Sequence, residues 1–368
     1  MTRAPASIVK TDVRVEQAPF AITVATMSLV AIVVASQGYV TIPLMPQIGA
    51  AWTVPQASVA WTTSAFAISY ACSSLLSGPL SDRYGRRLML VASIAAMAVV
   101  TALVPISADL VTGSMLRALQ GAMAGVFAPV AYAYIGERVP SQRLALSLTM
   151  ASCSLSGAIV IGQVAAQLLE STLGWRSVFW FTTPLLALAA AATRRVMLPD
   201  TSHNLPPGKS MIHGVISVLR CAQLLPLYAT ALTILGSLTA IYTGLQLYGP
   251  AELIGDASAM LALRASALPA MLAAVLLAPI LSRISAIVRG AVALAVAAIG
   301  MLGASLLANT VTGLVTALFV VVFGISTAGP AIVQAIGSSA GTARATGIAI
   351  YGFILSIGAG IGANSRWH

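Results

Sequence analysis

The chain has 368 residues, of which 58% are hydrophobic and only 8% are charged, and its mean hydropathy is +0.94. A water-soluble domain carries about a quarter charged residues, so this composition excludes a protein whose whole surface faces water. The formal net charge of +10 is compatible either with nucleic-acid binding or with the basic loops of a membrane protein.

Apolar stretches long enough for a helix to cross a hydrocarbon layer of roughly 30 Å recur along the chain. Helices are favoured because hydrocarbon offers no partner to unpaired backbone groups, and the short alternating strands of a membrane β-barrel are absent. The first part predicts six spans: Phe20–Pro43, Gln56–Leu76, Leu88–Ser107, Leu110–Gly136, Arg143–Leu168 and Ser177–Met197. The second part predicts five: Leu224–Leu247, Leu261–Leu281, Val288–Leu307, Val311–Ile336 and Thr342–Ala363.

One sizeable polar segment divides these spans. We therefore expect an N-terminal bundle of six helices over residues 1–197, a cytosolic linker over 198–220 and a C-terminal bundle of five helices over 221–368. The first apolar run is interpreted as a span rather than a cleaved signal peptide, because no clear cleavage site follows it. Cys72, Cys153 and Cys221 lie in or beside apolar runs and are interpreted as packing residues.

The basic residues alternate between the two sides of this topology. With a cytosolic N-terminus, fifteen Lys and Arg residues fall on the cytosolic side, while only Arg176, Arg264 and Arg366 fall on the other and Arg117 lies inside a span. Such asymmetry is typical of a multi-pass protein in the cell membrane. Because the charge is spread over many loops, it excludes a nucleic-acid partner.

The two halves resemble each other at an offset of about 200 residues. The stretch 78–83, Gly-Pro-Leu-Ser-Asp-Arg, aligns with 278–283, Ala-Pro-Ile-Leu-Ser-Arg, and Ala128-Pro129 aligns with Gly329-Pro330. Parallel repeats of helical halves are an architecture of membrane transporters, with the path for the solute between the halves.

The most specific local pattern is the loop Gly78-Pro79-Leu80-Ser81-Asp82-Arg83-Tyr84-Gly85-Arg86-Arg87. It resembles the signature loop Gly-x-Leu-(Ala/Ser)-Asp-Arg-x-Gly-Arg-(Arg/Lys) of the major facilitator superfamily. Gly85 is expected to allow a tight turn, and Gly78 a close approach of a neighbouring helix. The resemblance implies a two-bundle major facilitator fold and a conformational latch, with Asp82 near the start of the eleventh helix and its Arg344. Glu137 and Arg143 would extend this charge network; a solvated charge pair is the alternative.

Arg117 is the only charge well inside an apolar run, which makes it a functional candidate by default. The stretch Arg117-Ala-Leu-Gln120-Gly resembles the family's Arg-x-x-Gln-Gly motif, which is linked to proton coupling. Gln120 would share a helix face with it. The alternative is that Arg117 extends to the membrane surface.

Gly157 and Gly162 fall where drug:proton antiporters carry a glycine-rich motif, Gly-Pro-x-x-Gly-Gly. The match is partial, because Ala158 and Gln163 replace a proline and a glycine. Helix packing alone would also explain the two glycines. Over most of the chain, the resemblance is to the bacterial drug:proton antiporter branch.

No Asp, Glu or His lies in the middle of a predicted span, so a titratable group on the solute path is not evident. Polar and aromatic candidates for the cavity are Gln37, Tyr39, Tyr132, Gln163, Tyr242 and Gln246. Without a second cationic pocket, a hydrophobic or neutral solute is favoured over an anionic one.

The resemblance therefore predicts a monomeric secondary transporter that exports a drug-like small molecule in exchange for protons. A sugar or metabolite transporter with other coupling, and a non-transporting membrane sensor or inactive truncated product, are the alternatives. No catalytic cluster, metal site or cofactor is expected. The chain stops after the span that matches the fifth of the first half, so we expect that a twelfth helix is missing.

Overall fold

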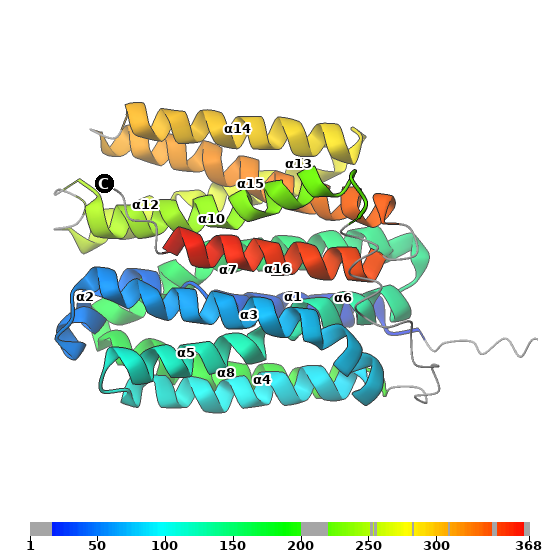
Figure 1. Ribbon diagram of the computed structural model, residues 1–368, viewed down its shortest axis with the longest axis horizontal. Coiled ribbons are helices and arrows are strands. Elements are labelled where there is room, and N and C mark those ends of the chain that lie inside the picture. Colours follow the sequence, from blue (N-terminus) through cyan, green and yellow to red (C-terminus); the bar gives the residue numbers. More distant parts are fainter. Residues whose placement is uncertain are drawn as a thin grey trace, which may run out of the picture.

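The computed structural model describes residues 17–199, 220–250, 253, 256–281, 283–307, 310–340 and 344–363. The regular elements in these ranges are helices, and the long ones lie side by side (Figure 1). Large apolar side chains point outward, and Leu188, Ile299 and Leu306 are 65%, 65% and 80% exposed. Such a surface would be a liability in water, whereas hydrocarbon solvates it.

The first part of the chain forms nine helical segments. They are α1 (Phe20–Ser36), α2 (Thr41–Trp52), α3 (Gln56–Tyr84), α4 (Arg86–Leu103), the 3₁₀ turn η1 (Val104–Ile106), α5 (Leu110–Ala124), α6 (Phe127–Arg138), α7 (Ser141–Leu173) and α8 (Trp175–Val196). The described part of the remaining chain forms α10 (Leu225–Tyr248), α12 (Ala257–Ala265), α13 (Ala267–Leu281), α14 (Ala286–Leu306), α15 (Val311–Ser339) and α16 (Arg344–Ala363).

Each of the eleven predicted spans coincides with helix. By length and composition, eight helical stretches among the described residues could cross a membrane, and the shorter apolar stretches Ser258–Ala274 and Gly347–Gly362 accompany them. Helix α8 covers 22 residues and carries arginines near both ends. The all-α membrane architecture expected from the sequence is therefore confirmed.

Three predicted spans are broken by prolines. A proline cannot donate to the carbonyl four residues earlier, and its ring collides with that carbonyl. The chain leaves the helix at 37–40 before Pro43, at 125–126 before Pro129 and at 266 before Pro269. The first two breaks place irregular backbone in the middle of the bundle, where it is tolerated only if it lines a cavity or is buried in protein.

Polar side chains cap α5, α12 and α15 at their starts. The Asp109 carboxylate accepts the backbone N–H of Thr112 at 2.8 Å, which holds the pKa of Asp109 below its usual value. Asp256 accepts two backbone N–H groups at the start of α12, with the same effect on its pKa. Thr310 caps α15 in the same way. Each cap satisfies backbone donors that the first helical turn leaves unpaired.

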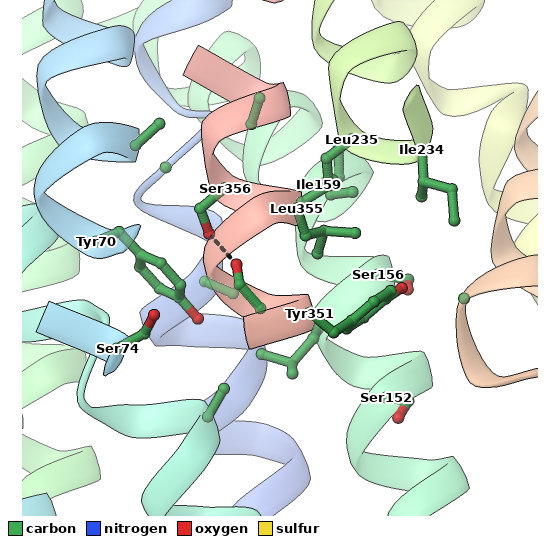
Figure 2. Close-up of a pocket in the computed structure, with 18 of the residues that line it drawn as sticks. Tyr70, Ser74, Ser152, Ser156, Ile159, Ile234, Leu235, Tyr351, Leu355 and Ser356 are labelled. Carbon is green, nitrogen blue, oxygen red and sulfur yellow. Dashed lines mark hydrogen bonds between the residues drawn. The ribbon is translucent and has the colours of Figure 1, made fainter. Parts of the chain in front are cut away.

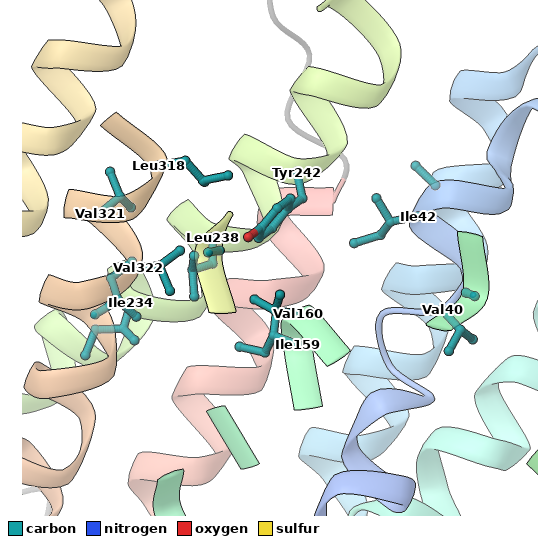
Figure 3. Packing of buried hydrophobic residues seen from close by; sticks show 14 of the residues in the cluster. Val40, Ile42, Ile159, Val160, Ile234, Leu238, Tyr242, Leu318, Val321 and Val322 are labelled. Atoms are coloured by element: carbon teal, nitrogen blue, oxygen red, sulfur yellow. The ribbon is translucent and has the colours of Figure 1, made fainter. Parts of the chain in front are cut away.

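In Figure 1, α1–α6 and α8 lie below α10–α16, α7 lies at the level of α16, and α16 runs along α3. Contacts between the two groups of helices, α1–α8 and α10–α16, are made mainly by α3 with α16 and by α7 with α12, α13 and α15. A continuous apolar core joins the groups: Val40, Ile42 and Val160 come from the first, and Leu238 and Val322 from the second (Figure 3). The offset seen in the sequence recurs in the helix starts, since α4 and α14 begin at 86 and 286, and α5 and α15 at 110 and 311.

Gly121 allows α3 and α5 to touch. A Cβ atom at this position would lie 2.1 Å from the backbone oxygen of Phe66. We expect Gly121→Ala to lower the free energy of unfolding by about 1–3 kcal/mol, because backbone must move to admit the methyl group. Thermal unfolding of the purified protein in detergent measures this. Gly136→Ala is the control, because nothing lies within 4 Å of an added Cβ there; equal losses in both variants would contradict the prediction.

Candidate functional site

A cavity of about 170 Å³ lies where the two groups of helices meet. Its walls come from α1, α3, α6, α7, α10, α15 and α16, and from the break between α1 and α2. Figure 2 shows Tyr70 of α3 on one side of this cavity and Ser152 and Ser156 of α7 on the other, with Tyr351 of α16 extending toward Ser156. The break at 37–40 contributes Gly38 and Tyr39 to the wall, and Pro129 of α6, shortly after the second break, also lines it.

The lining is apolar with a few hydroxyl groups. Four tyrosines contribute to it, namely Tyr39, Tyr70, Tyr132 and Tyr351, and among the described residues no charged side chain does. Tyr132 and Ser152 share a hydrogen bond of 2.9 Å, and Ser356 donates to the carbonyl of Gly352 at 2.8 Å. Because its hydroxyls can donate and accept, this surface suits an uncharged molecule with aromatic or apolar parts.

The predicted cavity residues separate into two groups. Tyr39 and Tyr132 line the cavity, whereas Gln37, Gln163, Tyr242 and Gln246 do not. Gln163 is buried on α7 and donates to the carbonyl of Ile159 at 3.0 Å. Gln37 lies in the network around the buried Arg117, and Tyr242 and Gln246 lie near the buried Arg264. Their role as contacts to a solute stays a prediction.

Arg117 is 1% exposed, so it does not extend to the membrane surface. One terminal N–H donates to the side-chain oxygen of Gln120. The Gln120 amide in turn donates to Thr101 at 2.7 Å and to Gln37 at 3.3 Å. The guanidinium carbon lies 4.5 Å from the centre of the Phe66 ring, and Nε and Nη2 have no hydrogen-bond partner in the part of the chain that the structure describes.

Arg264 is a second buried cation, which sequence reasoning counted among charges outside the spans. It is 2% exposed and donates from α12 to Gln246 of α10 and to Gln167 of α7. The bond to Gln167 joins the two groups of helices. The signal available in the sequence was the apolar residues on both sides of Arg264, which are typical of a span and not of a loop.

Gln167 is expected to matter through Arg264. Gln167→Leu should lower the free energy of unfolding by about 1–3 kcal/mol, because it leaves a buried charged donor without its acceptor. Adding Arg264→Met should remove that cost, because a buried charge replaced by an apolar side chain of similar volume is tolerated. Thermal unfolding of both single variants and the double variant measures the coupling; additive effects would contradict it.

The loop after α3 turns at Gly85, whose φ of 93° favours glycine. Arg86 forms an ion pair of 2.7 Å with Glu137, and Arg87 donates to the carbonyl of Arg194 at 3.1 Å. Arg83 lies 5.4 Å from the centre of the Tyr84 ring. The loop is thus bound to the end of α6 and to α8.

Other members of the predicted latch are placed differently or lie outside the description. Arg143 is exposed and lies 4.6 Å from the centre of the Phe20 ring. The side chains of Asp82 and Arg344 lie outside the described residues, so their predicted pairing is untested. The close approach expected at Gly78 is not found, because no atom lies within 4 Å of an added Cβ there.

The two glycines of the predicted motif in α7 have different surroundings. A Cβ at Gly162 would lie 2.7 Å from the Cβ of Ser36, so this glycine sets the packing of α1 on α7. At Gly157 the nearest atoms are side-chain methyl carbons at 3.7 and 3.9 Å, which an added methyl group would contact normally. Packing therefore accounts for Gly162 and not for Gly157.

Among the described residues, no group of three or more His, Cys, Asp or Glu side chains could hold a metal ion. In a comparison with known protein families, the chain matches the Major Facilitator Superfamily over residues 27–363.

Similar proteins include the multidrug resistance protein MdtG of Salmonella typhimurium, 34% identical over 204 residues, which are 52% of this chain and 48% of MdtG. MdtG of Escherichia coli O9:H4 is 32% identical over 60% of this chain and 54% of the relative. The uncharacterized MFS-type transporter YwfA of Bacillus subtilis is 28% identical over 39% of this chain and 35% of YwfA. The chain spans about half the length of the curated MdtG relatives it matches.

Proposed function

Because the chain belongs to the Major Facilitator Superfamily, we propose that it is a secondary transporter for an uncharged, hydrophobic or drug-like small molecule. It is a multi-pass membrane protein, and its family implies a small-molecule substrate. The observation that carries the proposal is the cavity between the two groups of helices, whose described wall contains four tyrosines and no charged side chain. A charged molecule would lose its hydration there without compensation.

An alternating-access transporter must close its cavity on one side of the membrane at a time, and contacts between the two groups of helices are candidates for that closure. Gln167 lies eight residues beyond Ile159 of the cavity wall, or about 12 Å along α7. Apolar residues such as Ile42, Val160 and Leu238 fill the space near this level (Figure 3). Ser64 of α3 donates to the carbonyl of Gly360 of α16 at 2.8 Å, and Arg264 bonds Gln167. We infer that these contacts form the closed gate.

The remaining expectations are part of the same proposal. Residues 1–197 and 221–368 would be the two moving bundles of a monomer in the inner membrane, joined by the cytosolic segment 198–220, with the N-terminus cytosolic. Proton-coupled export would use Arg117 and Gln120, with the loop from Gly78 to Arg87 as a latch. The ion pair of Arg86 with Glu137 supports the latch, and the similarity to MdtG, a multidrug resistance protein, supports export of a drug-like molecule.

Transport in proteoliposomes tests the proposal. The purified protein is reconstituted with an imposed pH gradient, and the movement of N-phenyl-1-naphthylamine, a neutral fluorescent probe, is followed against protein-free vesicles. We expect gradient-dependent flux of the probe. Flux without gradient dependence would overturn proton coupling but keep transport. Flux of a radiolabelled sugar and not of the probe would favour the sugar transporter, and no flux of either would overturn the function.

A further inference from the structure

Phe66 contacts both the cavity and the buried charge beside it. Its side chain is 5% exposed and contributes to the cavity wall, which Arg117 does not. The same ring lies 4.5 Å from the guanidinium carbon of Arg117 and stacks on the ring of Tyr70 with 6.2 Å between the centres. One aromatic side chain therefore stands between an uncharged cavity and a cation.

The backbone and ring of Phe66 are both held in place. Its backbone oxygen faces Gly121, where even a Cβ would approach to 2.1 Å, so α3 cannot shift toward α5. Its ring edge packs on Gly38, where an added Cβ would lie 3.2 Å from the ring. Phe66 thus has a fixed position over Arg117.

Arg117 has unused hydrogen-bonding capacity. Its Nε and Nη2 have no partner, and among the described residues no carboxylate pairs with it. A guanidinium presents its N–H groups in a fork that matches a carboxylate. The carboxylate must contact the guanidinium directly to form these hydrogen bonds. A carboxylate that stays in the cavity loses hydration, and the Phe66 ring between it and Arg117 leaves only a weakened attraction.

We propose that Phe66 is the specificity-determining residue of the cavity. Its ring keeps Arg117 from contacting the transported molecule and so excludes solutes that carry a carboxylate. When the ring is removed, Nε and Nη2 of Arg117 become a carboxylate-binding site that opens from the cavity. This inference rests on the proposed function, since it concerns which molecules the same cavity accepts.

Two probes of the same shape test the proposal: 2-naphthamide, which is neutral, and 2-naphthoate, which carries a carboxylate. Equilibrium dialysis with purified protein gives both dissociation constants without any gradient. We expect the wild type to prefer the amide and Phe66→Ala to bind the carboxylate at least about tenfold more tightly than the wild type does, the size of one hydrogen-bonded charge contact. The gain should disappear in Phe66→Ala/Arg117→Gln.

Control variants separate the new contact from extra space. Ile234→Ala also enlarges the cavity, through α10, and should change the affinities for both probes in the same proportion. Phe66→Leu serves if Phe66→Ala does not fold, and should give a smaller gain that also requires Arg117.

The inference would be overturned if the gain in carboxylate affinity persists without Arg117, or if a folded Phe66 variant shows no gain. In either case, binding of the amide by the wild type would leave the proposed function intact. Binding of neither probe by any variant, together with no flux in proteoliposomes, would overturn both.

Discussion

Arg117→Gln is expected to reduce gradient-driven transport by about tenfold or more, the size of a typical coupling free energy between two sites. The reason is that Arg117 is a buried cation that, among the described residues, bonds only the neutral side chain of Gln120 and stacks on Phe66. Nothing in this contact set compensates its charge, so the fold does not need the arginine for an ion pair. The same substitution should leave thermal stability unchanged or higher, because a neutral amide is easier to bury than an unpaired guanidinium.

These two readouts separate a functional role of Arg117 from a structural one. Flux of N-phenyl-1-naphthylamine with and without the pH gradient is compared for the wild type, Arg117→Gln and Arg176→Gln. Arg176 is exposed and donates to the carbonyl of Pro105 at 3.0 Å, so its loss should affect neither flux nor its dependence on the gradient. Normal gradient-driven flux in Arg117→Gln would exclude a role of Arg117 in proton coupling. A large loss of thermal stability in this variant would indicate a structural role.

The sequence predicts the spans well because the energetic cost of polar backbone in hydrocarbon acts on every residue of a span. It also contains the reason for the helix breaks, since Pro43, Pro129 and Pro269 each disrupt the helix about four residues earlier. What those breaks do could not be predicted in the same way. That Tyr39 lines a cavity, and Gln37 beside it joins the network of Arg117, depends on how α1 rotates against its neighbours.

Arg264 and Phe66 show where local patterns fail. Arg264 falls near the start of the predicted span Leu261–Leu281, where a basic residue is usually solvated. In the structure it lies in the last turn of α12, and only its contacts to Gln167 and Gln246 reveal its burial. Phe66 is an ordinary apolar residue in its own sequence context, and its importance comes from Arg117, 51 positions away in sequence. Gly78 shows the opposite error, because a motif glycine was assigned to packing where there is open space. Each case depends on tertiary neighbours that no local pattern encodes.

A disulfide between α3 and α16 should stop transport. A Cβ built on Gly360 lies 3.4 Å from the Cβ of Ala67, close to the separation found in disulfides. Ala67→Cys and Gly360→Cys, combined with replacement of Cys72, Cys153 and Cys221 by alanine, would therefore join the two groups of helices at their close approach. Because alternating access requires α3 and α16 to separate there, the oxidised protein should be inactive and reduction should restore flux.

The controls for this cross-link address the cavity itself, since Ala67 also lines it. Each single-cysteine variant receives the same oxidant and should keep its flux, which excludes blockage by the new side chain or damage by the oxidant. Binding of the probe to the oxidised protein should persist, because the cavity already exists while α3 and α16 are in contact. Equal flux in the oxidised and reduced forms, with the disulfide verified by mass spectrometry, would mean that the Ser64–Gly360 contact is not part of a gate. A protein that binds but does not transport while cross-linked would instead identify this contact as one that must open in each cycle.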